Sequence, residues 1–68
     1  MKEYYDLVEC LRVTESQLRT AENRLNYATD ELLIDSLIYE IDSLYKRYAY
    51  YLRLCKELNK AEGEGYAV

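Results

Sequence analysis

Apolar residues recur in this chain at alternating intervals of three and four, and this spacing constrains the fold more than any other feature. Such a heptad repeat puts the apolar residues on one stripe of an α-helix and conflicts with the alternation of a β-strand. The first stripe consists of Tyr4, Leu7, Leu11, Thr14, Leu18, Ala21, Leu25 and Ala28. The second consists of Ile34, Leu37, Ile41, Leu44, Tyr48, Tyr51, Cys55 and Leu58. The sequence therefore predicts an all-α protein with helices over about residues 3–27 and 31–60.

The two stripes are out of phase with one another between residues 26 and 31. The first stripe would continue at Leu32, whereas the second begins at Ile34, so one continuous coiled-coil helix is disfavoured. Asp30 is a suitable N-cap, because its carboxylate can accept hydrogen bonds from the free amides of Leu32 or Leu33. We expect a turn here that makes residues 1–60 a single helical hairpin.

The distribution of charge favours antiparallel helices. Residues 30–42 hold acids and no base, whereas residues 43–60 hold Lys46, Arg47, Arg53, Lys56 and Lys60 against one acid, Glu57. The start of the first helix is acidic in balance, and residues 16–28 are slightly basic. Folding back would bring the acidic start of the first helix beside the basic end of the second. Residues 61–68 lose the apolar spacing, and we expect them to form a frayed acidic tail.

The second helix carries more apolar surface than the first can cover. Ile38, Tyr45 and Leu52 follow one another at heptad position e, beside the stripe, and Leu33 and Leu54 lie at position g. A 68-residue chain is seldom stable with one thin core layer, and an uncovered apolar strip commonly marks an interface. We therefore predict self-association into an antiparallel four-helix-bundle dimer through Ile38, Tyr45 and Leu52. The alternative is a monomer that leaves these side chains in water.

Composition argues against several classes of function. The chain has no His, which excludes a Ser-His-Asp triad and a His-dependent zinc site, and its length does not accommodate a two-layer α/β enzyme. The two cysteines, Cys10 and Cys55, form no disulfide framework. We predict no catalytic residue, metal site or cofactor. Acidic residues near Met1 and the lack of a long apolar run favour a cytoplasmic protein without a membrane segment.

The segment Asn23–Glu57 contains a distinctive set of residues, namely Asn26, Thr29-Asp30, Leu33-Ile34-Asp35, Ile38-Tyr39-Glu40-Ile41, Lys46-Arg47-Tyr48, Tyr50-Tyr51-Leu52 and Lys56-Glu57. Together these residues resemble the YaaL-like family of short uncharacterised Firmicute proteins. The family has Pro after the Asp, where this chain has Glu31. The resemblance implies a helical fold and a bacterial setting, and it implies no reaction.

The outward side of the second helix is a candidate surface for a protein partner. Tyr39, Lys46, Tyr50 and Arg53 share this side, and Tyr and Arg are common in binding hot spots. Alternatively, the side is merely solvated and held by local pairs of Asp42 with Lys46 and of Lys46 with Tyr50. The basic and aromatic residues 45–56 also allow a role as a nucleic-acid-associated accessory protein. The net charge of −4 and the placement of several rings on the stripe disfavour that role.

Overall fold

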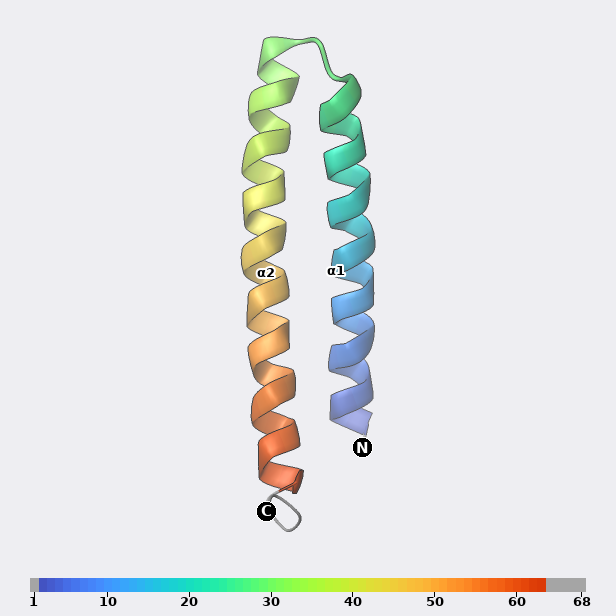
Figure 1. The fold of residues 1–68 in the computed structure, drawn as a ribbon, viewed down its shortest axis with the longest axis vertical. Coiled ribbons are helices and arrows are strands. Elements are labelled where there is room, and N and C mark those ends of the chain that lie inside the picture. Colours follow the sequence, from blue (N-terminus) through green and yellow to red (C-terminus); the bar gives the residue numbers. More distant parts are fainter. Residues whose placement is uncertain (1, 64–68) are drawn as a thin grey trace.

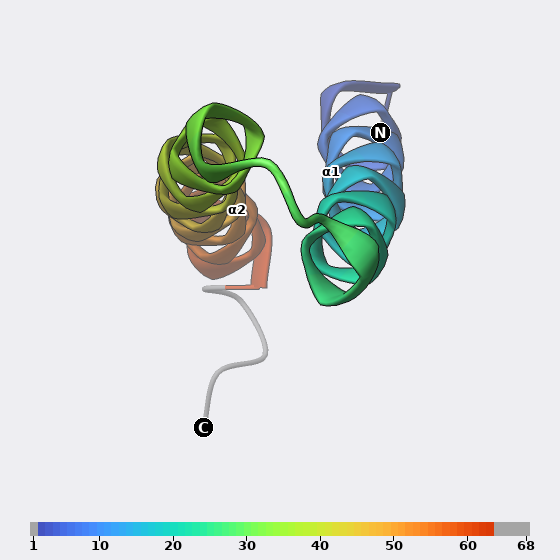
Figure 2. The same ribbon diagram turned by 90° about the horizontal axis from the view of Figure 1, so that it is seen from above.

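Two antiparallel α-helices joined by a short turn make up the fold (Figure 1). The structure is a computed structural model that describes the backbone of residues 2–63 and the side chains of residues 3–60. Helix α1 spans Lys2–Tyr27 and helix α2 spans Glu31–Gly63, with no strand in this part of the chain. The helices lie side by side in both views and form a rod of 53 × 16 × 15 Å (Figures 1 and 2). The predicted hairpin and its helix boundaries are confirmed to within a few residues.

The two apolar stripes face each other and form the core. Every stripe residue is buried or half-buried, including the tyrosines at positions 4, 48 and 51. At the centre, Leu18, Ala21 and Leu44 are 7%, 1% and 5% exposed, and Ile41 and Tyr48 pack against them. The heptad spacing therefore predicted correctly which side of each helix is covered.

One polar residue, Thr14, lies within the core and is only 2% exposed. Its hydroxyl donates a hydrogen bond of 2.7 Å to the backbone carbonyl of Cys10, one turn earlier in α1. A buried hydroxyl without a partner would cost free energy, and this bond removes the cost within the helix itself. Thr14 can thus occupy a stripe position without any polar partner on α2.

The turn is built around Asp30. Its carboxylate oxygen Oδ1 accepts hydrogen bonds from the amides of Leu32 and Leu33, at 2.9 and 3.1 Å. Its carbonyl accepts the first helical hydrogen bond, from the amide of Ile34, at 2.9 Å. At the end of α1, the amide of Ala28 donates to the carbonyl of Leu25 at 3.3 Å, which closes the last turn. Asp30 is therefore the N-cap, as its position in the sequence predicts.

Two details differ from the sequence-based expectations, the end of α2 and the ion pairs, whereas the state of the cysteines agrees with them. Helix α2 continues to Gly63, three residues beyond its expected end, so only residues 64–68 of the expected tail lie outside the described residues. The ion pairs of the described side chains both lie within a helix, Glu15 with Arg19 and Asp42 with Lys46, and none joins α1 to α2. The two cysteines are free, Cys55 being buried and Cys10 half-buried. The packing of the stripes, rather than ion pairing, therefore holds the helices together.

Candidate interaction surfaces

The predicted self-association face lies along one edge of the hairpin. Ile38 and Tyr45 are 51% and 53% exposed, and Leu52 is half-buried. These residues are seven apart, so they follow one line along α2 at intervals of about 10 Å. On α1, position e at the same edge holds Val8, Glu15 and Glu22. We call the line of Ile38, Tyr45 and Leu52 the α2 edge strip.

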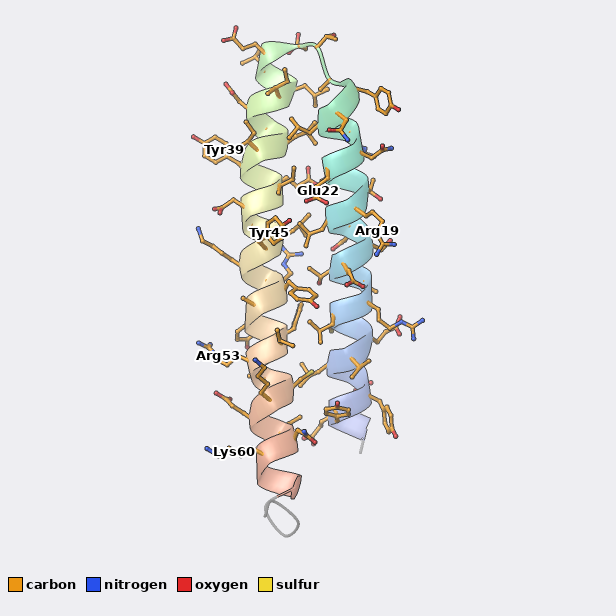
Figure 3. The ribbon with its side chains drawn as sticks, viewed as in Figure 1. Arg19, Glu22, Tyr39, Tyr45, Arg53 and Lys60 are labelled. Atoms are coloured by element: carbon orange, nitrogen blue, oxygen red, sulfur yellow. The ribbon has the colours of Figure 1, made fainter. Side chains whose placement is uncertain are left out.

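Tyr45 also has a contact that the sequence analysis did not predict. Its hydroxyl donates a hydrogen bond of 2.8 Å to Oε2 of Glu22 on α1, and Figure 3 shows the two side chains approaching each other across the hairpin. This hydrogen bond, followed by the negative charge of Glu22 and partial burial, raises the pKa of Tyr45 above its usual 10.0. The bond fixes the phenol end against α1, and half of the residue remains exposed.

The side of α2 that faces away from α1 carries the predicted partner face, which consists of Tyr39, Lys46, Tyr50 and Arg53. Tyr39 is 77% exposed and points away from α1 (Figure 3). Lys46 is bound to Asp42, with Nζ and Oδ2 2.8 Å apart, as the solvated alternative predicts. The same alternative predicts a pair of Lys46 with Tyr50, and this is wrong. The Tyr50 ring pairs with Arg53, whose guanidinium carbon lies 5.8 Å from the ring centroid. The four residues thus share one side of α2. Tyr50 pairs with Arg53, and Lys46 pairs with Asp42.

A groove at the open end of the hairpin was missed by the sequence analysis. Leu7, Leu54 and Leu58 line it together with Glu3, Asp6 and Glu57, and its volume is about 470 Å³. The distribution of charge in the sequence predicts that acidic residues of α1 meet basic residues of α2 at this end. Instead, Glu57, the one acid among the bases of residues 43–60, joins two acids of α1. The signal for this groove was the position of Glu57 next to the stripe residue Leu58.

No part of the described chain gathers the groups of a metal site. Among the described residues, no three side chains of His, Cys, Asp or Glu come together in a way that could hold an ion. Neither helix, over the residues described, contains a stretch long and apolar enough to cross a membrane.

Comparison of the chain with protein-family models, with curated proteins and with solved structures gave no match. The resemblance to the YaaL-like family stays a prediction, and the function has to be argued from the surfaces themselves.

Proposed function

We propose that this chain is a small, non-catalytic helical interaction module that acts in the cytoplasm and pairs with a second copy of itself. The observation that carries the proposal is the α2 edge strip, in which two large apolar side chains remain about half exposed beside the core. Chains of this size gain stability from a second layer, because a single seam between two helices buries little surface. The second copy would supply that layer and complete an antiparallel four-helix bundle.

The total surface of the hairpin supports this proposal. The accessible surface is 5618 Å², whereas a compact monomer of 8.1 kDa is expected to expose about 4500 Å². The excess of about 1100 Å² is of the size that one chain contributes to an ordinary protein interface, about 800 Å². A surplus of this size is enough for one pairing of ordinary extent.

The test is the oligomeric state at equilibrium. We expect sedimentation equilibrium to show a dimer at high micromolar concentration, and thermal melting to shift upward with protein concentration because association stabilises the folded state. Leu52→Glu should yield a monomer of lower stability. Ser43→Glu is the matched control, because it adds the same carboxylate to an exposed position on the same helix and should leave the dimer intact. A parent chain that sediments as a monomer at high micromolar concentration contradicts the proposal.

The partner face offers a second candidate function, the binding of another protein. This candidate is favoured by the high exposure of Tyr39 and by the pairing of the Tyr50 ring with Arg53, which presents an aromatic and a cationic group together. The double variant Tyr39→Ala with Tyr50→Ala should change the free energy of unfolding by no more than about 0.5 kcal/mol. It should nevertheless lose the proteins that co-purify with the parent. Unfolding of the variant with its partners retained would show that these rings are structural.

A nucleic-acid-associated role through residues 45–56 remains the alternative and uses part of the same side of α2. Two observations count against RNA binding. Asp42 neutralises the charge of Lys46, and the rings of Tyr48 and Tyr51 are half-buried in the core. Fluorescence anisotropy with a single-stranded RNA distinguishes the roles. An RNA reader should bind in a way that weakens steeply with salt and depends on Arg47 and Arg53 more than on Tyr39. A protein-binding surface should leave the RNA unbound at moderate salt.

A further inference from the structure

The charges of α2 are unevenly distributed along its length, and among the side chains of residues 3–60 they form no ion pair with α1. Residues 30–42 contain five acids and no base, and residues 43–60 contain five bases and one acid. The ion pairs seen between described side chains are confined to single helices. Two copies of α2 placed antiparallel would bring the acidic half of each copy beside the basic half of the other. The charge pattern is therefore complementary to itself in one orientation, antiparallel.

The apolar residues of the α2 edge strip obey the same symmetry. Tyr45 lies at the midpoint of the strip, with Ile38 seven residues before it and Leu52 seven residues after it. In an antiparallel pair of α2 helices with a two-fold axis at Tyr45, each Ile38 meets Leu52 of the second copy. Both contacts lie about 10 Å from the axis, on opposite sides of it. The two Tyr45 rings meet at the centre, where each has its hydroxyl held by Glu22 of its own hairpin.

The neighbouring row, at heptad position b, matches this register. It consists of Asp35, Asp42, Ala49 and Lys56, all of them exposed. Around the same axis, Asp35 faces Lys56 of the second copy, which makes two ion pairs about 16 Å from the centre. Asp42 faces Ala49, a small residue that lets the helix backbones approach. The charged pairs thus flank the apolar centre, as in the rim and core of an ordinary interface.

The other surfaces of the hairpin are less suited to such a pairing. On α1, position e at the same edge is occupied by Val8, Glu15 and Glu22, so that row is mostly charged. On α2, position g at the opposite edge is apolar only at its two ends and charged between them, with Leu33, Glu40, Arg47 and Leu54 in order. Of the described rows beside the two stripes, the α2 edge strip alone presents three large apolar residues in succession.

We propose that two hairpins pair through their α2 helices, antiparallel and with the two-fold axis at Tyr45, and that Asp35 and Lys56 of opposite copies fix this orientation. This inference rests on the self-association proposed above and adds its geometry. The interface is isologous, so every contact occurs twice and a single substitution acts at two places.

The test is a charge exchange between two variants, read by sedimentation equilibrium at low ionic strength. Asp35→Lys alone places like charges opposite each other at both ends of the interface and should weaken the dimer roughly tenfold, as should Lys56→Asp alone. A mixture of the two variants restores both pairs in the heterodimer, which should form with close to the parental affinity. Glu40→Lys is the matched control, because it makes the same change of charge on the opposite edge and should have little effect.

A cross-linking experiment tests the position of the axis independently of the charges. In a background of Cys10→Ser and Cys55→Ala that retains its helicity, Tyr45→Cys should oxidise to a disulfide-linked dimer at least tenfold faster than Tyr39→Cys. Cysteines can bridge only when their Cα atoms come within about 7 Å, which two copies of residue 45 satisfy at the axis. A dimer in which Asp35→Lys behaves like Glu40→Lys and Tyr45→Cys does not cross-link would overturn this geometry and leave self-association standing. A monomeric parent would overturn both.

Discussion

The importance of the seam between the helices can be measured by removing one buried side chain, Leu44, and comparing it with an exposed one in the same helix. Leu44 is 5% exposed and belongs to the central cluster with Leu18 and Ala21. Leu44→Ala removes three carbon atoms from this cluster. At about 0.8 kcal/mol for each, the lost transfer free energy is about 2.4 kcal/mol. The cavity left behind adds to this value.

The cavity contribution should be small in this molecule. The seam of a two-helix hairpin has solvent on both sides, so neighbouring side chains can move into the space or water can enter. We therefore expect a total loss of about 2.5–3 kcal/mol, near the lower end of the range for Leu-to-Ala changes in cores. A domain of this length has a free energy of unfolding of about 3–10 kcal/mol, so the loss is a large fraction of it. The melting temperature should fall by about 10–20 °C.

Leu32→Ala is the matched control, since it makes the same chemical change on α2 at a residue that is 80% exposed. It should alter the free energy of unfolding by less than about 0.5 kcal/mol. Both variants are compared with the parent by urea unfolding followed by circular dichroism, at one protein concentration. Equal destabilisation by the two variants would refute the reasoning, because burial at the seam would then not determine stability.

Further outcomes follow from the cap, the Tyr45 contact and the cysteines. Asp30→Ala should destabilise the hairpin by about 1 kcal/mol, measured by urea unfolding, whereas Asp30→Asn keeps the cap and most of the stability. The hydrogen bond to Glu22 raises the pKa of Tyr45 in the folded state, so its contribution is complete below pH 10 and is lost as pH rises through the raised pKa. Unfolding curves at increasing alkaline pH should therefore converge for the parent and Tyr45→Phe, and Glu22→Gln should remove the effect. Buried Cys55 should react with a thiol reagent much more slowly than half-buried Cys10, as followed by mass spectrometry; equal rates would contradict the packing of Cys55.

The features that could be predicted from the sequence are those determined within a few residues. The apolar spacing alone indicates which side of each helix is buried, because side chains three and four apart share a helix face. The cap was predictable for the same reason, since Asp30 bonds amides only two and three residues away. Neither feature depends on how far one helix is shifted along the other.

The contact between Tyr45 and Glu22 depends on that shift and was missed. Both residues occupy position e, and in an antiparallel pair these positions face each other at the same edge. Pairing the two e rows explicitly would have placed Tyr45 beside the acids of that row, Glu15 and Glu22, which line one hollow with it. The heptad pattern of α2 alone assigns Tyr45 to an interface with another molecule, and the exposed half of Tyr45 remains available for that role.

The local pairs on the helix surfaces depend on the direction in which helical side chains lean. Helical side chains lean towards the N-terminus of the helix, so a long basic side chain reaches the residue three or four positions before it. Lys46 accordingly contacts Asp42, and Arg53 contacts Tyr50. The expected pair of Lys46 with Tyr50 required Lys46 to lean in the opposite direction and did not form. Direction as well as spacing is needed to predict such contacts.

The charge pattern of α2 predicted the antiparallel hairpin correctly. The ion pairs between α1 and α2 on which that prediction was based are not seen among the described side chains. Opposite signs at the two ends of α2 favour an antiparallel neighbour of matching pattern, whichever helix that neighbour is. The acidic start of α1 meets Glu57 rather than a base at the open-end groove, so α1 does not satisfy the pattern there. Apolar packing, the cap and the hydrogen bond between Tyr45 and Glu22 account for the pairing of α1 with α2. An antiparallel second copy of α2 would be complementary to the charge pattern that α1 does not match. The charge exchange between Asp35 and Lys56 tests this complementarity directly and is therefore the decisive experiment.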